Sequence, residues 1–163
     1  MSMWIPREEW IKTLPLTVVA SCVLMLDRDG RVLLLRYGPG QPVAGQWWLP
    51  GGMLDHGEDP WAAARREMNE ETGVELDDEP RLIGTDHRVD VESTGPVIDY
   101  FFHGGVHTGD QPIRLSPEHD RHAFKHLDEL RDTPLSARLQ TLTAIYAAAR
   151  SGSAVYLREG SPL

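Results

Sequence analysis

The segment formed by residues 50–74 constrains this chain most, because it specifies a turn, a helix and a second turn in direct succession. It begins with a Pro-Gly-Gly turn. Asp59 followed by Pro60 is typical of a helix N-terminus, since an acceptor side chain caps free N–H groups and proline fits the first helical position. Gly73 lies where a left-handed cap would end the helix. The sequence therefore predicts a helix over residues 60–72 between two loops.

Three glutamates share one face of this predicted helix. Glu67, Glu70 and Glu71 fall within an arc of roughly 100°. Glu67 and Glu71 are like charges four residues apart, a spacing at which they repel each other. Oxygen-rich clusters of this kind suit hard cations such as Mg²⁺ or Mn²⁺, which also bind substrate phosphates. A glutamate-rich solvated helix is the simpler alternative, but the fixed glycines and the specified helix ends favour a metal site. An apolar stripe beside the glutamates predicts burial against a sheet: Trp61, Ala64, Met68 and Thr72.

The spacing of this segment resembles the box motif of the Nudix, or MutT-type, hydrolase family. The pattern reads Gly52, five residues, Glu58, seven residues, Arg66-Glu67, an aliphatic position, one residue, Glu70-Glu71, one residue, Gly73 and an aliphatic position. The resemblance implies the α/β Nudix fold, an α/β/α sandwich with a mixed β-sheet, over nearly the whole chain. It also implies Mg²⁺-dependent or Mn²⁺-dependent hydrolysis of the pyrophosphate linkage in a nucleoside diphosphate linked to another group X, by attack of water on phosphorus.

The resemblance assigns roles to particular residues. The metal ligands would be Glu67, Glu70, Glu71 and the carbonyl of Gly51. Arg66 would orient these carboxylates, and Gly52, Glu58 and Gly73 would shape the box. The general base stays open between a box glutamate and Glu118 in a late loop, for which an ordinary surface role is the alternative.

Candidate substrate-binding residues lie before the box. Arg36 and Tyr37 end a predicted strand and could meet ribose or phosphate. Trp47 and Trp48 are neighbours, so in a strand one would face the core and the other the mouth of the site, where it could stack on a base. Core packing explains either tryptophan equally well. Signatures of particular Nudix subgroups are absent, so the substrate stays open among nucleoside triphosphates, oxidised nucleotides and nucleotide sugars. A non-catalytic, nucleotide-sensing Nudix-fold module is the alternative function, and the complete set of box glutamates argues against it.

Length and charge indicate one domain and narrow the partners. The 163 residues are predicted to form a single domain over 1–163, with 1–15 as a helical N-terminal extension. The net charge of −9 argues against a nucleic-acid polymer as partner and leaves a small nucleotide or diphosphate substrate neutralised by metal ions. No apolar run is long enough to span a membrane. A single cysteine, Cys22, excludes a disulfide within the chain, and we expect a cytoplasmic protein. Homodimer formation through Trp4 and Trp10 and packing of these residues on their own sheet both stay open.

Apolar periodicity and turn residues predict the remaining elements. Strands are expected at 17–26, 31–37, 80–91, 97–108, 121–126 and 154–157, and helices at 6–14 and 135–150. Turns are expected at 27–30 and 92–96, and a loop bordering the site at 38–46. The histidines, His119 among them, are predicted to be surface or partly buried residues, because no cysteine or zinc-binding histidine motif accompanies them.

Overall fold

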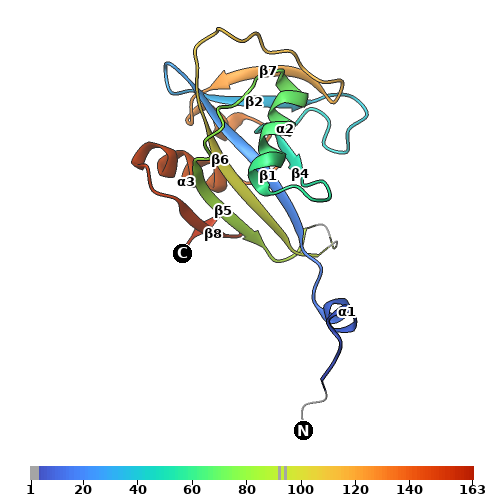
Figure 1. Cartoon of the computed structure of the whole chain (residues 1–163). Helices are drawn as coiled ribbons and strands as arrows, with labels where there is room; N and C mark the ends of the chain where they lie inside the picture. The colour runs from blue at the N-terminus through green and yellow to red at the C-terminus, as the bar shows by residue number, and fades with distance from the viewer. Residues whose placement is uncertain (1–3, 92, 94) are drawn as a thin grey trace.

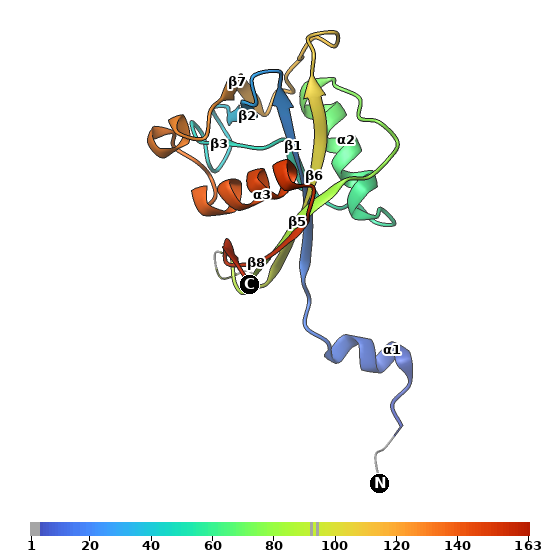
Figure 2. The same cartoon turned by 90° about the vertical axis from the view of Figure 1, so that its left-hand side faces the viewer.

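A mixed β-sheet lies between two helices that cover its opposite faces (Figures 1 and 2). The computed structural model describes residues 4–91, 93 and 95–163. The helices are α1 (Arg7–Trp10), α2 (Pro60–Thr72) and α3 (Leu139–Ser151), with 3₁₀ turns at Ile11–Thr13 and Glu129–Asp132. The strands are β1 (Val18–Asp27), β2 (Val32–Tyr37), β3 (Trp47–Trp48), β4 (Gly51–Met53), β5 (Leu82–Arg88), β6 (Val97–His107), β7 (His119–Lys125), β8 (Val155–Arg158) and β9 (Ser161–Pro162). The predicted α/β/α sandwich with a mixed sheet is confirmed.

Strand β1 is the centre of the sheet. The main strand order is β3-β2-β1-β6-β5-β8-β9, with β4 paired to β1 and β7 paired to β2. Strands β1 and β6 run parallel, whereas β1 is antiparallel to both β2 and β4. Val23, Leu24 and Met25 are consecutive and buried, because helices cover both faces of this strand. The predicted hairpin is present but short, since β2 leaves β1 to pair with β7.

Helix α2 has the bounds that its sequence predicts. The side chain of Asp59 accepts hydrogen bonds from the main-chain N–H groups of Trp61 (2.8 Å) and Ala62 (3.0 Å). Gly73 ends the helix with φ of 70° and donates its N–H to the carbonyl of Asn69. The predicted stripe is buried at Ala64, Met68 and Thr72, and Trp61 packs against it in part. This packing fixes which face of α2 points away from the sheet.

Helix α3 begins at Leu139 and not at residue 135 as predicted. The residues before it pair with β3 instead, because the N–H of Trp47 donates to the carbonyl of Pro134 (2.8 Å) and the N–H of Ser136 donates to the carbonyl of Trp47 (3.1 Å). The helical periodicity of residues 135–150 does not reveal that β3 competes for the first of them. The segment at 134–138 therefore runs alongside β3 before α3 starts.

The N-terminal extension lies apart from the sheet (Figures 1 and 2). Neither α1 nor the following 3₁₀ turn contains a buried residue, and Trp4 is 83% exposed. The extension is thus a short α-helix followed by a 3₁₀ turn in place of the continuous helix expected at 6–14, and it does not cover its own sheet. Among the described residues, no helix has the length and apolar character needed to cross a membrane. The predicted turn at 92–96 includes residues 92 and 94, which lie outside the described residues.

Candidate active site

Glu71 is the buried centre of the candidate site. Helix α2 places it against β4, and only 6% of the residue is exposed. Its Oε2 accepts a hydrogen bond of 2.8 Å from the main-chain N–H of Gly51. Burial raises the pKa of this carboxyl to about 8, the Gly51 hydrogen bond opposes the shift, and the charges of Glu67, Glu118 and Glu70 add to it. Glu71 therefore sits in a negative and poorly hydrated place.

Two box glycines leave no room for a side chain. A Cβ at Gly51 would overlap the carbonyl oxygen of Ser21 and lie 2.7 Å from Cα of Cys22. A Cβ at Gly52 would lie 2.7 Å from Cδ of Glu67. The glycines therefore let β4 approach both β1 and the acidic face of α2, which is a physical reason for their place in the motif.

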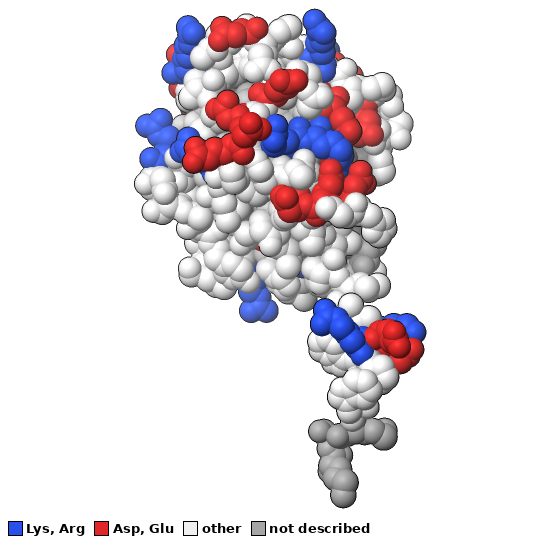
Figure 3. All heavy atoms as spheres, viewed as in Figure 1, with Lys and Arg blue, Asp and Glu red and all other residues white. Residues whose placement is uncertain are grey.

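Arg66 joins the loop after β4 to the acidic face. Its Nε and Nη2 donate to the two carboxylate oxygens of Glu58 at 2.8 and 3.0 Å, and Nη2 also donates to the carbonyl of Met53 at 3.0 Å. Its Nη1 donates to Glu67 at 2.8 Å and to Glu70 at 3.3 Å. The bond from Arg66 lowers the pKa of Glu58. Basic and acidic side chains are interspersed over the face that α2 presents (Figure 3).

The donor set around Glu71 fits a hard divalent cation by its chemistry. The described part of the chain holds no group of three or more histidine, cysteine or acidic side chains already arranged as metal ligands. Arg66 and the N–H of Gly51 instead take up oxygens of Glu67, Glu70 and Glu71. Burial also raises the pKa of Glu67, although Arg66 opposes that shift. Carboxylate oxygens under mutual repulsion are stabilised by added positive charge, and oxygen-only donors are those that Mg²⁺ prefers.

His119 is a site residue that sequence reasoning missed. It is 7% exposed, and its Nε2 lies 3.7 Å from Oε1 of Glu71. Its ring packs on Tyr37 with centroids 5.0 Å apart, and Nδ1 is 3.4 Å from Oγ of Ser116. Burial lowers the pKa of His119, which favours the neutral imidazole. The pairing of Tyr37 with His119 across β2 and β7 brings the ring there, and no local motif announces that pairing.

Glu118 directly precedes this histidine, in the loop that leads into β7. Its carbonyl accepts a hydrogen bond of 2.8 Å from the N–H of Gly38, and its charge contributes to the raised pKa of Glu71 and of Glu67. The preceding residues are tied to the end of α2, because the N–H of Ser116 donates to the carbonyl of Glu71 (3.2 Å). The structure thus brings the predicted loop glutamate close to the box glutamates. Its role as general base stays a prediction.

The predicted substrate-binding residues separate into different environments. Arg36 is engaged by Asp120 through two hydrogen bonds of 2.7 and 2.6 Å, so the guanidinium already has a protein partner. Tyr37 is partly buried, and burial raises the pKa of its hydroxyl. Trp47 is partly buried with Nζ of Lys125 5.6 Å from its ring centroid. Trp48 is 8% exposed, packs in the core under α3 and lines a cavity.

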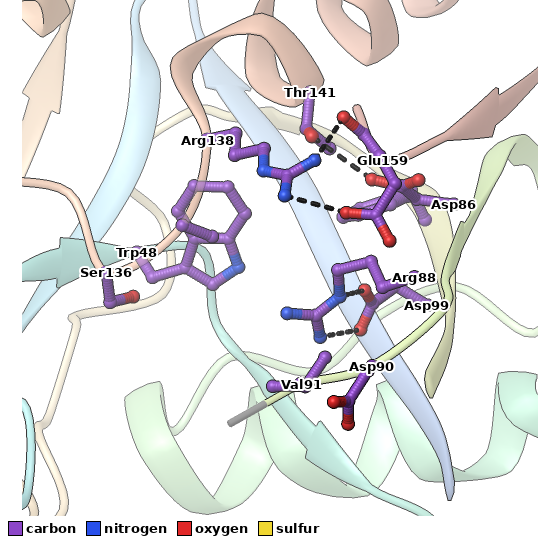
Figure 4. A pocket seen from close by; sticks show the side chains of 12 residues that line it. Trp48, Asp86, Arg88, Asp90, Val91, Asp99, Ser136, Arg138, Thr141 and Glu159 are labelled. Carbon is purple, nitrogen blue, oxygen red and sulfur yellow. Dashed lines mark hydrogen bonds and ion pairs between the residues drawn. The ribbon is translucent and has the colours of Figure 1, made fainter. Parts of the chain in front are cut away.

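That cavity has a volume of about 260 Å³ and highly charged walls (Figure 4). Its lining includes Trp48, Arg88, Asp99, Arg138, Thr141 and Glu159. Nε of Arg88 lies 2.7 Å from Oδ2 of Asp99, and Nη2 of Arg138 lies 2.7 Å from Oε2 of Glu159. Except for Trp48, the sequence analysis missed these residues, because they come from distant strands and loops.

Comparison with solved structures agrees with this fold. The UDP-X diphosphatase structure aligns with a TM-score of 0.73 and 18% identity, over 94% of this chain and 75% of that one. The Nudix hydrolase from Nitrosomonas europaea aligns with a TM-score of 0.68 and 24% identity, over 91% and 94%.

Sequence comparison identifies the family. The RNA pyrophosphohydrolase of Acidiphilium cryptum (strain JF-5) is 37% identical over 124 residues, which cover 69% of this chain and 73% of that protein. The family model described as the NUDIX domain matches residues 15–144. The chain belongs to the Nudix hydrolase family.

Proposed function

We propose that this Nudix hydrolase cleaves the pyrophosphate linkage of a nucleoside diphosphate linked to another group X, with Mg²⁺ or Mn²⁺ as cofactor. The observation that carries the proposal is the burial of Glu71 among Glu67, Glu70 and Glu118, with a pKa raised to about 8. A protein gains little stability from such a cluster. A cation bound between the carboxylates and a substrate pyrophosphate removes the repulsion among these carboxylates, and its role in hydrolysis accounts for the acidic cluster.

The residues of the candidate site have different roles in this reaction. Glu67, Glu70, Glu71 and the carbonyl of Gly51 would hold the cation, which when bound supplies positive charge to the phosphate oxygens and lowers the pKa of water. Arg66 fixes the directions of Glu67 and Glu70 through its bonds at 2.8 and 3.3 Å. Glu118 accepts a proton from the attacking water. The P–O bond to the leaving group then breaks, which gives a nucleoside monophosphate and a phosphorylated remainder when X is attached through phosphate.

The alternative is a Nudix-fold module that binds a nucleotide without cleaving it. The intact set of box glutamates and the position of Glu118 beside them favour the hydrolase. A binding module needs no proton acceptor next to a buried carboxylate. The two functions separate on turnover, because only the hydrolase releases new phosphorus products.

One relative adds a further kind of molecule to the candidate substrates. The relative named RNA pyrophosphohydrolase favours including an RNA that carries a terminal pyrophosphate, which the net charge of −9 alone argues against. The proposal is tested by incubating the protein with nucleoside triphosphates, oxidised nucleotides, nucleotide sugars and such an RNA, with Mg²⁺ or with EDTA, and following the products by ³¹P NMR. Turnover of at least one substrate that stops on chelation is expected. Turnover that persists in EDTA, or none with any of them, contradicts the proposal.

A further inference from the structure

The carboxylate of Glu71 is held at one oxygen only. Its Oε2 accepts the hydrogen bond of 2.8 Å from the N–H of Gly51. Its Oε1 accepts no hydrogen bond from the residues that the structure describes, although the residue is 6% exposed. Buried polar atoms are normally paired, because burial removes the water that would otherwise bind them. The group that faces Oε1 therefore determines whether this side chain keeps one orientation.

The imidazole of His119 is the group that faces Oε1. Its Nε2 lies 3.7 Å from this oxygen, slightly beyond the length of a direct hydrogen bond. The side chain of His119 is 3% exposed and that of Glu71 is 8% exposed, so little water competes for the two atoms. A small movement of either side chain brings a donor at Nε2 into contact with the carboxylate.

The ring of His119 is held on its other sides. Tyr37 packs on it with ring centroids 5.0 Å apart and a tilt of 39°. Oγ of Ser116 lies 3.4 Å from Nδ1, where its hydroxyl donates if Nδ1 carries no proton. The other tautomer would turn the lone pair of Nε2 toward a carboxylate, which is unfavourable. The contacts therefore favour the tautomer with its N–H at Nε2, directed at Glu71.

The backbone also sets the place of this ring. The N–H of His119 donates to the carbonyl of Ser116, and the N–H of Ser116 donates to the carbonyl of Glu71, both at 3.2 Å. The pairing of β2 with β7 shifts by one residue between Arg36 and Tyr37, which brings His119 opposite Tyr37. Such irregularities re-aim side chains and are frequent beside active sites. The turn and the shift together direct His119 to the end of α2.

We propose that His119 is a positioning residue that acts through Glu71, giving its carboxylate a second hydrogen-bond donor and so fixing the orientation in which it receives a divalent cation. The inference rests on the proposed function, because it assigns a partner to a proposed ligand. A carboxylate has about four acceptor positions, so donors from Gly51 and His119 leave room for a cation. Partners of this kind are worth about 10–100-fold in metal affinity.

Mn²⁺ affinity of matched variants tests the donor. His119→Gln keeps an N–H at the place of Nε2, whereas His119→Phe keeps a ring against Tyr37 but has no N–H in its side chain. Electron paramagnetic resonance of free Mn²⁺ at pH 8 is expected to show about tenfold weaker binding by His119→Phe and near-parent binding by His119→Gln. His122→Ala removes an exposed side chain from the same strand and should bind as the parent does. Equal affinities of the parent and His119→Phe would overturn the proposal.

A merely structural role for His119 predicts the opposite order of the two variants. His119→Phe retains the packing on Tyr37 and would then match the parent, whereas His119→Gln loses the ring and would bind most weakly. Melting temperatures of the same proteins measure the packing separately. A metal affinity that follows the melting temperature, with His119→Gln lowest in both, would overturn the positioning role.

The ring proton gives a second reading. Long-range ¹H–¹⁵N NMR of the histidine rings, recorded with saturating Mg²⁺ at pH 8, reports which nitrogen carries the proton, and the loss of one signal set in His119→Gln assigns it. The proton is expected on Nε2. A proton on Nδ1 would overturn the proposal, because no N–H would then face Glu71.

Failure of this proposal is distinguishable from failure of the proposed function. If turnover requires Mg²⁺ while His119→Phe binds Mn²⁺ as the parent does, the hydrolase proposal holds and the role of His119 is refuted. If Mn²⁺ affinity and the ring proton follow the expected pattern but no phosphorus product forms with any substrate, His119 positions Glu71 and the hydrolase proposal fails. A parent protein that binds no Mn²⁺ contradicts both.

Discussion

The main-chain N–H of Gly51 donates a hydrogen bond of 2.8 Å to Oε2 of Glu71, which joins β4 to the acidic face of α2. This bond keeps one oxygen of a buried carboxylate in a fixed direction. Burial and three neighbouring glutamates oppose ionisation of Glu71. The pH at which Glu71 loses its proton therefore depends on the burial and charge of the site.

The pH dependence of stability should reveal Glu71 in the metal-free protein. Its folded pKa of about 8 lies above the ordinary value of 4.5, so the folded state holds the proton more tightly. The resulting stability is fully present below about pH 4.5 and is lost as the pH rises through 8. Urea unfolding in EDTA at pH 5 and pH 8.5 should show a loss on the order of a few kcal/mol for this residue. Glu71→Gln should lack that part of the dependence, and identical profiles for parent and variant would contradict the raised pKa.

Arg66→Lys should impair activity although it keeps the charge. A lysine cannot reproduce the two-point bond to Glu58 together with the bonds to Glu67 and Glu70. We expect kcat to fall about 10²-fold, the scale on which misplaced catalytic groups act, with a smaller change in melting temperature. Steady-state kinetics on the substrate found in the panel measures it. The control is Arg65→Lys on the neighbouring position, and equal activity of both variants would refute a role for Arg66.

Much of the fold could be predicted because its determinants are local. The ends of α2 follow from Asp59, Pro60 and Gly73, and its buried stripe follows from helical periodicity. The start of α3 could not be predicted, because Trp47 pairs with the residues before that helix. A pairing between segments that are far apart in the sequence produces no local sequence pattern in either segment.

The residues of the candidate site also include some that the sequence predicted and some that it did not. Its box glutamates and Arg66 occupy one continuous motif, and the resemblance named them. His119 and the pair of Arg88 and Asp99 depend instead on which strands become neighbours. Each looks like an ordinary polar residue of a half-exposed strand, so spacing alone did not distinguish them.

Gly52→Ala should disturb catalysis through Glu67. The added Cβ would lie 2.7 Å from Cδ of Glu67, so this side chain must move away from β4. We expect kcat to fall about tenfold or more, since displacement of a catalytic group by about 1 Å has effects of that size. A double-mutant cycle with Glu67→Gln provides the control, because the two losses should be non-additive if they act on the same carboxylate. Simple additivity would place the effect of the glycine elsewhere.

His119→Ala should destabilise the protein and loosen the region that holds Glu118. It removes the ring that packs on Tyr37 and faces Glu71, and we expect a loss of about 1–3 kcal/mol in the free energy of unfolding. His122→Ala on the same strand removes an exposed side chain and should change stability by less than about 0.5 kcal/mol. Denaturant unfolding of both variants makes the comparison, and equal small effects would show that His119 is not part of the packed site.

Direct measurement of Mn²⁺ binding tests whether the acidic face of α2 holds a divalent cation. Electron paramagnetic resonance of free Mn²⁺ at pH 8, titrated with the parent and with Glu71→Gln, gives both affinities, and Glu75→Gln serves as control just beyond the helix. We predict that the parent and Glu75→Gln bind Mn²⁺ alike and that Glu71→Gln binds at least about tenfold more weakly, since one ligand charge is gone. Equal binding by the parent and Glu71→Gln, or no binding by the parent, would contradict it.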